Sequence, residues 1–579
     1  MKIQKTKENF FVKKTFQKFF MPAILSSLWL ALGGIADCVF VGNGVGSEGL
    51  AAVSLGMPVY LFYNILSLGM SIGGSIQFSS YTARGEFEKG NQVFNTIWKG
   101  LLLIYIVTAG LGIVFLPQLM QFLGAEVTDA VTAEYIRTQL ICVPVMFLQG
   151  PLYYFIHNDD APKLAALSLT ISNITDIILN YILVVQLELG VKGSVYATVG
   201  GAVVLITISI IHINRKKGVL AFKKGSIQLN ILGEAMKTGF ATSVQYLYQF
   251  ITIILVNNIL MGMAGKDGVA AFDVIYNLSL LFTAVADAVA LTIEPMISSY
   301  RSERNTSNIK STLVETTGYT AFLGGILAVA CWIGTEWLVV LFGLDTAKQQ
   351  LYGAAGIRIY LVSVGFMYAN SILSYFYQCM EKEKYAFFIT TMRSLIFYVC
   401  GLWIFKNGAV TVLWLHFIFA ELFTLILWLV IAFVKKDLLG LKEIDTGNVK
   451  AFFIDSKDTD ISAVIQEIEE FAQTREVSVK QTYYLSLVIE EICCAVFEHC
   501  KSESEQIYIQ ITVVIEEDYC ELYIRDNALA FNPFSLESQE NVELMDKDMD
   551  ALGMEIVKKK AKEFSYRRYI GFNTLVVKV

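Results

Sequence analysis

The chain has 579 residues, of which 55% are apolar and 17% charged, and its formal net charge is −7. A soluble globular protein carries about 25% charged residues, so this composition excludes a single soluble domain. The nine cysteines are scattered, which excludes a secreted disulfide scaffold, and an acidic balance without a basic stripe argues against a nucleic-acid partner.

Up to residue 434 the chain consists of apolar segments separated by short polar turns. A helix needs roughly 20 mostly apolar residues to cross about 30 Å of hydrocarbon. We therefore expect an all-α polytopic membrane protein with a short N-terminal segment at 1–18, and no cleavable signal peptide, because the lysine-rich start leads straight into the first span. Twelve spans are expected, near 19–42, 50–79, 96–120, 133–157, 163–187, 191–213, 235–262, 268–298, 313–342, 351–378, 385–405 and 408–434.

Lys and Arg residues gather at the N-terminus and in every second loop. The basic clusters lie at 2–18, at Arg84 and Lys89, at 215–224, at 301–310, at Lys382 and Lys384, and at Lys435 and Lys436. Short loops rich in Lys and Arg stay in the cytoplasm. We therefore expect a multi-pass protein in the lipid bilayer of the cell membrane, with both termini cytoplasmic.

The two halves of the apolar region repeat each other. Residues 46–52 recur at 265–271, 219 positions later, and Ser79-Ser80-Tyr81 recurs at 298–300 with the same spacing. Six spans per repeat make the halves parallel, as in transporters that open a central cleft alternately to either side. The expected parts are a first membrane repeat at 19–213, a basic cytoplasmic linker at 214–234 and a second membrane repeat at 235–434.

Four polar residues in the first and fifth spans are candidates for binding a cation. An ionisable residue inside a span costs about 2.5–3.5 kcal/mol on insertion scales, so it is a functional candidate. Asp37 lies late in the first span, and Asn173, Asp176 and Asn180 share one face of the fifth. Their oxygens suit Na⁺, or one carboxylate takes up a proton, which desolvation favours. A purely structural polar clamp is the alternative.

The eighth span carries a second acidic set, Asp273, Asp287 and Glu294, spaced so that all three share roughly one face. This face is expected to point into the bundle, where it would attract a cationic substrate or carry protons. Arg393 in the eleventh span is the expected counter-ion or a substrate contact. Three residues of the seventh span either line the same cleft or form ordinary interhelical hydrogen bonds: Gln245, Tyr248 and Gln249.

Two motifs resemble those of the multidrug and toxic compound extrusion (MATE) transporters. The first is Asp37 followed by Phe40-Val41-Gly42 and Gly49-Leu50-Ala51-Ala52, and the second is Glu294-Pro295-Met296-Ile297-Ser298-Ser299-Tyr300, where the family usually has Gln-Pro. The resemblance covers about residues 15–435. It implies H⁺- or Na⁺-driven export of small organic, mostly cationic compounds, with Arg393 at a position where the family often has Arg. It also implies a cation site at Asp37 and the fifth span, where the family's Asn-x-x-x-Asp pair reads Asp176-x-x-x-Asn180.

From Asp445 onward the chain is acidic soluble sequence, with 26 acidic and 14 basic residues. Residues 480–500 carry apolar side chains at helical spacing, and 507–515 alternate as a half-buried strand does. Further strands are expected at 520–526, 564–570 and 573–579, and a helix near 551–563. This order predicts a linker at 435–448 and an α+β domain at 449–579.

This domain resembles the ATP-binding domain of histidine kinases and of anti-sigma-factor serine kinases. Glu491 matches the candidate base, Asp526 begins a segment like the adenine-binding Asp-x-Gly loop, and Gly553 belongs to a glycine box whose N–H groups face phosphate in the family. Ala495 stands where the family has its Mg²⁺-binding Asn, and an alanine side chain has no oxygen to offer a metal. ATP is therefore a possible ligand, with weakened or absent hydrolysis.

The sequence thus predicts a cation-coupled antiporter with a degenerate ATP-binding-like regulatory domain, which senses nucleotide or docks a cytoplasmic regulatory protein. No firm catalytic residue is expected unless Glu491 is active, and no metal beyond Na⁺ at Asp37, Asp176 and Asn180. Two other classes stay open. One is a membrane sensor whose C-terminal domain signals as a serine kinase or anti-sigma-like module, and the other is a flippase of lipid-linked saccharides, a class that tends to carry several cationic residues in its cleft.

Overall fold

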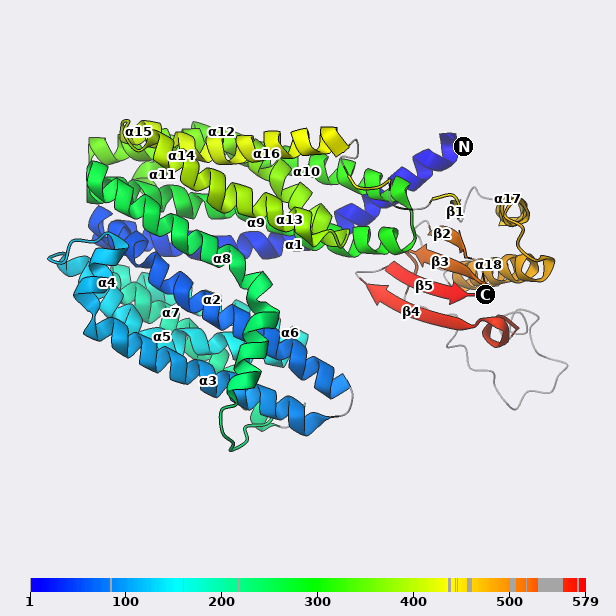
Figure 1. Ribbon diagram of the computed structural model, residues 1–579, viewed down its shortest axis with the longest axis horizontal. Helices are drawn as coiled ribbons and strands as arrows, with labels where there is room; N and C mark the ends of the chain where they lie inside the picture. The colour runs from blue at the N-terminus through cyan, green and yellow to red at the C-terminus, as the bar shows by residue number, and fades with distance from the viewer. Residues whose placement is uncertain are drawn as a thin grey trace.

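A computed structural model of the chain describes residues 2–83, 86–159, 161–215, 219–435, 439–442, 444, 446–455, 461–499, 507–516, 518–529, 556–569 and 572–579. A long helical bundle carries a smaller domain with a β-sheet at one end, and both ends of the chain lie at that end of the molecule (Figure 1). We call the end of the bundle that faces the sheet the near end, and the opposite end the far end.

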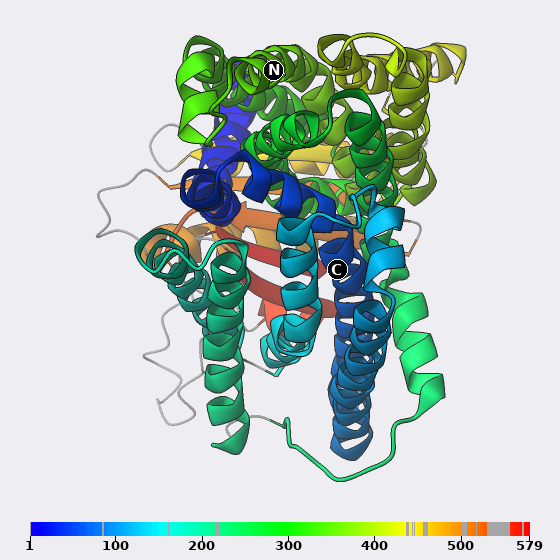
Figure 2. The ribbon, with the colours of Figure 1, turned by 90° about the vertical axis from the view of Figure 1, so that its left-hand side faces the viewer.

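The bundle has two lobes, which Figure 2 shows from the far end, most of the C-lobe above and most of the N-lobe below. The N-lobe contains α1 (Lys2–Val45), α2 (Ser47–Ala83), α3 (Phe87–Val114), α4 (Leu116–Leu123), α5 (Ala130–His157), α6 (Pro162–Asn180), a π-helix (Tyr181–Gln186) and α7 (Val191–Asn214). The C-lobe contains α8 (Leu229–Ala264), α9 (Lys266–Ser302), α10 (Thr306–Ile333), α11 (Thr335–Leu341), α12 (Ala347–Cys379), α13 (Glu383–Thr391), a second π-helix (Met392–Ile396), α14 (Phe397–Phe405), α15 (Val410–Leu413) and α16 (Leu415–Lys435).

The expected polytopic α-helical architecture is confirmed. In the part of the chain that the structure describes, eleven helices are long and apolar enough to cross a membrane, and a shorter apolar stretch, Ala31–Val45, ends α1. The first expected span, 19–42, therefore lies within one continuous helix that extends far beyond it. The third expected span is broken in two, because Pro117 occupies the first turn of α4 and a proline cannot continue the preceding helix.

The two lobes interlock through their first helices. Within the bundle α1 packs chiefly along α9, and α2 packs along α8. The second pair can approach closely because glycine lies at the crossing: a Cβ atom on Gly73 would lie 1.9 Å from the carbonyl oxygen of Ala235. Small residues at this crossing thus let two helices from different lobes share one packed core.

The lobes also meet at the far end through two asparagine side chains. The Nδ2 group of Asn43 in α1 donates to the carbonyl oxygen of Leu341 in the C-lobe, at 2.7 Å. The Nδ2 group of Asn258 in α8 donates to the carbonyl oxygen of Phe122 in the N-lobe, at 3.4 Å. These contacts hold the far ends of the lobes together.

The C-terminal domain is built on a five-stranded antiparallel sheet in the order β1-β2-β3-β5-β4. Its elements are β1 (Val449–Asp455), α17 (Ile461–Thr474), α18 (Val479–His499), β2 (Tyr508–Ile515), β3 (Cys520–Asp526), β4 (Glu563–Tyr569) and β5 (Phe572–Lys578). The strands agree with the sequence prediction to within about two residues, but β1 and α17 were not predicted. Of the helix expected near 551–563, the described part is helical over 556–560.

All eight residues of β2 are buried. Its sequence alternates between apolar and other residues, a pattern that is typical of a strand with one solvent-exposed face. Ile509, Ile511 and Val513 share a core with residues of α17 and α18. The alternate residues point to the other face of the sheet. Tyr508 clusters there with residues of α1, and Thr512 bonds to the end of α9, so the near end of the bundle covers this face.

Candidate functional site

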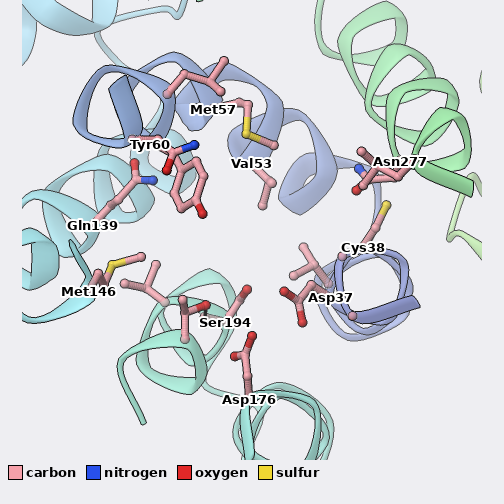
Figure 3. Close-up of a pocket in the computed structure, with 18 of the residues that line it drawn as sticks. Asp37, Cys38, Val53, Met57, Tyr60, Gln139, Met146, Asp176, Ser194 and Asn277 are labelled. Atoms are coloured by element: carbon pink, nitrogen blue, oxygen red, sulfur yellow. Dashed lines mark hydrogen bonds between the residues drawn. The ribbon is translucent and has the colours of Figure 1, made fainter. Parts of the chain in front are cut away.

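A cavity of about 480 Å³ lies where the two lobes face each other. It is lined by α1, α2, α5, α6 and α7 of the N-lobe and by α8 and α9 of the C-lobe. Its lining includes three carboxylates, Asp37, Asp176 and Asp273, and none of the described residues that line it is Lys, Arg or His. In Figure 3 the carboxylates of Asp37 and Asp176 face each other from two helices. The cavity is therefore strongly acidic.

Asn180 joins two of these carboxylates. Its Nδ2 group donates to Oδ1 of Asp37 at 2.7 Å and to Oδ1 of Asp176 at 3.4 Å. Its own Oδ1 atom is buried and has no hydrogen-bond partner among the described residues. Asn173, on the same helix, lines the cavity. The structure thus brings together all four residues of the predicted cation site.

The α-helix that carries this group changes its winding directly after Asn180. There α6 gives way to the π-helix at Tyr181–Gln186. Such π-helical turns are rare and occur frequently at functional sites, because they leave backbone groups and side chains in positions that a regular helix does not offer. No signal in the sequence marked this change.

Asp273 is the third acid of the cavity, and its side chain is nearly inaccessible to solvent. Its Oδ2 atom accepts from the Sγ atom of Cys38 at 3.4 Å and from Nδ2 of Asn277 at 3.1 Å. Cys38 follows Asp37 in α1. Asp37 accepts a hydrogen bond from Asn180 of α6, and Cys38 donates one to Asp273 of α9. Helix α1 is therefore the element that links the acids of the two lobes.

The C-lobe has its own cavity of about 840 Å³, lined by Gln245, Gln249 and Arg393 from the predicted cleft set. Asp287 lies beside it, because the hydroxyl of Tyr375, a lining residue, donates to Oδ1 of Asp287 at 3.1 Å. Gln249 lines both cavities. Gln249 therefore lies at the boundary between the two cavities.

The counter-ion expected for Arg393 is corrected by the structure. Arg393 pairs with Glu421 of α16 and not with an acid of α9: its Nη2 and Nε atoms lie 2.7 and 3.0 Å from Oε1 of Glu421. Nδ2 of Asn370 donates to Oε2 of the same carboxylate at 2.8 Å. Sequence reasoning missed Glu421, although an acid inside the apolar segment 408–434 is a signal of the same kind as Asp37.

Two further cleft predictions are not supported. Tyr248 lines neither of these two cavities, because its side chain is buried and its hydroxyl lies 2.9 Å from the Thr391 hydroxyl in a helix–helix hydrogen bond. Glu294 lines neither cavity, and its side chain is exposed. The acids of α9 therefore do not form one stripe in one cleft: Asp273 and Asp287 serve different cavities, since spacings of 14 and 7 residues spread them along the whole helix.

In the C-terminal domain, Asp526 ends β3 with its side chain buried. Its Oδ1 atom accepts from the backbone N–H of Ala528 at 3.0 Å and from Nδ2 of Asn573 at 2.7 Å. Glu491 lies on α18, whereas Gly553 lies outside the described residues. Among the residues that the structure describes, no group of three His, Cys, Asp or Glu side chains suits a metal ion.

Residues 22–182 and 238–403, more than half of the chain, match the MatE family. The chain belongs to this family. Residues 454–578 match a second family, the histidine kinase-like ATPase domain. Both resemblances inferred from the sequence are therefore confirmed, and the protein is a membrane transporter of the MATE multidrug efflux type with an ATPase-like domain. Transporters of this kind move small compounds across membranes, coupled to ions.

Among its relatives, this MATE transporter is 22% identical over 352 residues to a Bacillus subtilis protein named "Probable multidrug resistance protein YoeA". That match covers 59% of this chain and 75% of the relative. The chain is 25% identical over 270 residues to the "Multidrug export protein MepA" of Staphylococcus saprophyticus, which covers 46% of this chain and 60% of the relative.

Solved MATE structures share the fold of the bundle. An inward-facing MATE family transporter of the MOP superfamily superposes with a TM-score of 0.65 at 18% identity, over 72% of this chain and 96% of that one. An outward-facing transporter described in the same terms superposes with a TM-score of 0.55 at 19% identity, over 75% of this chain and 97% of that one.

Proposed function

We propose that this MATE transporter exports small organic cations across the cell membrane in exchange for H⁺ or Na⁺, with the near end and both termini in the cytoplasm. The observation that carries the proposal is the charge of the cavity between the lobes: three carboxylates line it, and none of its described lining residues is basic. A cavity of one charge sign attracts ligands of the opposite sign and rejects ligands of its own.

The aromatic lining of the same cavity favours an organic cation. Tyr60, Tyr135, Tyr246 and Tyr276 line it together with the acids. A cation over the face of an aromatic ring gains roughly 0.5–2 kcal/mol, and more when water is excluded. Aromatic rings beside carboxylates therefore suit a substrate that is both apolar and positively charged.

The proposed exchange follows because the coupling ion and the organic cation both bind to the negative charge of the cavity carboxylates. Asp37 and Asp176 are joined by Asn180, whose unpartnered Oδ1 atom adds a third oxygen for Na⁺. A proton on either acid has the same effect, because it removes one negative charge from the cavity. Two cations in one low-dielectric cavity repel each other strongly. Entry of the coupling ion therefore weakens binding of the organic cation and releases it.

We propose that residues 449–579 form a regulatory unit beside the two transport lobes at 19–213 and 235–434. Asp526 is held by two donors at the end of β3, which supports binding of a polar ligand such as an adenine ring or a partner's side chain. Ala495 offers no oxygen to a metal, which supports sensing or docking and argues against kinase chemistry.

Transport by the purified chain in proteoliposomes tests this function. Under an imposed pH or sodium gradient, a panel of cationic dyes is expected to accumulate and anionic dyes of similar size are not. Asp37→Asn is expected to reduce gradient-driven transport to background. The matched control is Glu336→Gln, an acid of α11 that pairs with Arg358 outside both cavities. Full gradient-driven transport by Asp37→Asn would refute the site.

A further inference from the structure

The sheet of the C-terminal domain has a second face, and part of it contacts the membrane part of the chain. In the antiparallel register, Gln510 of β2 lies opposite Arg525 of β3 and Phe453 of β1. Successive strand residues point to opposite faces. We call this the docking face and define it by Phe453, Tyr508, Gln510, Thr512 and Arg525. Phe453 and Tyr508 cluster with α1, Thr512 and Arg525 bond to Glu303, and Gln510 is buried beside them.

A buried ion pair lies at the centre of the docking face. Nη2 of Arg525 lies 2.6 Å from Oε1 of Glu303, and the two side chains are 9% and 3% exposed. The Thr512 hydroxyl donates to the second oxygen of Glu303 at 3.1 Å. Burial raises the pKa of Glu303, and Arg525 opposes that rise. A pair this deeply buried holds its two elements in one defined arrangement, because losing either partner leaves a buried charge without compensation.

Aromatic contacts extend the docking face to the first helix. Phe11 and Phe19 of α1 cluster with Phe453 and Tyr508, and the Phe11 and Phe453 rings lie 5.7 Å apart at 63°. The ammonium group of Lys14 lies 5.4 Å from the centre of the Tyr508 ring. The domain is therefore attached to α1 as well as to α9.

The elements that the domain holds carry three of the acids at the two transport cavities. Glu303 directly follows α9, which bears Asp273 and Asp287, and α1 bears Asp37. Arg304, the next residue, has a left-handed backbone (φ 52°), which is uncommon for a residue other than glycine. It pairs with Glu516 of the soluble domain. The docked domain thus fixes the turn between α9 and α10.

The domain also lies across the near end of the bundle. Figure 1 shows the sheet directly beyond that end, and Figure 2, along the bundle, shows the sheet behind the helices of the bundle. All the contacts described above involve α1, α9 and the turn after α9. Alternating access requires the near ends of the lobes to approach each other while the far ends separate.

We propose that the docked domain is autoinhibitory: it clamps α1 and the α9–α10 turn through the docking face and blocks the approach of the N-lobe at the near end. This inference rests on the transport activity in the proposed function.

Charge variants of the full chain test the clamp. Glu303→Gln is expected to free the domain and to raise transport turnover by about fivefold or more, within the usual range of allosteric coupling. The double variant Glu303→Arg with Arg525→Glu restores a pair of reversed polarity and is expected to return turnover toward that of the wild type. Glu467→Gln is the matched control, because its pair with Lys450 is partly exposed and lies entirely within the C-terminal domain. Docking is followed by the distance between spin labels on α10 and α17.

A second readout does not depend on the substrate. Hydrogen exchange of the α1–α2 turn at the far end is expected to become faster in Glu303→Gln, because this turn opens only when the near end closes. If the wild type moves no cationic dye, the proposed substrate class is wrong. Hydrogen exchange of the α1–α2 turn then tests autoinhibition by itself. Faster exchange in Glu303→Gln supports autoinhibition. An undocked domain with unchanged exchange, or a domain that stays docked in Glu303→Gln, overturns it.

Discussion

At the scale of single residues, the charges inside the bundle fall into two kinds. Asp37, Asp176 and Asp273 face a cavity that has no described basic residue in its lining. Glu421 and Arg393 neutralise each other. An unpaired buried charge is expensive, so an acid without a basic partner is the one available to a proton, a metal ion or a cationic substrate. We therefore propose that the acids of the cavity between the lobes act in transport and that the Arg393–Glu421 pair does not.

The pair in the C-lobe is predicted to be structural. Arg393→Met should destabilise the protein by about 3–5 kcal/mol, because it leaves Glu421 without its cation. Adding Glu421→Met should recover most of that loss, which thermal unfolding of the single and double variants measures.

Arg358→Met is the control, because its pair with Glu336 is half-exposed and should contribute at most about 1 kcal/mol. A stable Arg393→Met protein that no longer binds substrate would instead make Arg393 a substrate contact.

The sequence could reveal which residue types lie in each span but not which neighbours they meet. Asp37 and Asp176 were predicted because a carboxylate in hydrocarbon is unusual, and Asn173 and Asn180 because they share a helix face with Asp176. The partner of Arg393 depends on which faces of α14, its preceding π-helix and α16 meet, and no local pattern encodes this. For the same reason the sequence could not decide between the two alternatives for Tyr248, and the structure shows the interhelical hydrogen bond, to Thr391.

At the scale of helices and strands, the duplication predicted from the sequence has a structural counterpart at the far end. Asn43 of the N-lobe bonds to the carbonyl of Leu341, and Asn258 of the C-lobe bonds to that of Phe122. Phe122 and Leu341 are 219 positions apart, the spacing of the repeat. Each lobe thus closes the far end with an amide from its first helix and a carbonyl from its third span.

Glycine makes this closure possible, which leads to a prediction for α1. A Cβ atom on Gly42 would lie 2.0 Å from the carbonyl oxygen of Phe342, so Gly42→Ala should keep the far end open and slow transport. Gly343, on the other side, has a left-handed backbone (φ +84°). Labelling of a cysteine introduced beside Asn43 by a membrane-impermeant thiol reagent should become faster in Gly42→Ala.

Gly110→Ala is the matched control, since no atom lies within 4 Å of the added methyl group. Unchanged labelling and transport in Gly42→Ala would show that the lobes do not need this contact to close.

Some elements escaped prediction for identifiable reasons. β1 is short and carries two adjacent aromatic residues, Phe452 and Phe453, because both of its faces are buried, one by α17 and α18 and the other by α1. A strand buried on both faces lacks the alternation by which strands are recognised. The two π-helices have no sequence signature, whereas the break before α4 follows from Pro117, which a pattern of hydropathy alone passes over.

At the scale of the whole molecule, the chain joins a transporter to a domain that contacts it through one face and presents Asp526 on the other side of the same strand. ATP is predicted to bind the full-length protein, and Asp526→Asn should weaken binding at least about tenfold, because a charge-assisted hydrogen bond to the ligand is lost. Equilibrium binding of a fluorescent ATP analogue measures this. Hydrolysis should stay at background, since Ala495 cannot hold Mg²⁺.

Glu521→Gln is the matched control, because Glu521 lies on the same strand and pairs with Lys578 away from Asp526. Equal binding of the ATP analogue by the wild type and Asp526→Asn, or no binding by either, would refute the prediction that ATP binds at Asp526.

The proposed transport function depends most on the acidic cavity between the lobes. Its most direct test is equilibrium binding of a fluorescent organic cation to the purified transporter, titrated against H⁺ and Na⁺ separately. One of these ions should displace the dye competitively in the wild type, and Asp37→Asn should lose both dye affinity and displacement, while Glu336→Gln keeps them. Dye binding that is indifferent to both ions, or that survives unchanged in Asp37→Asn, would contradict it.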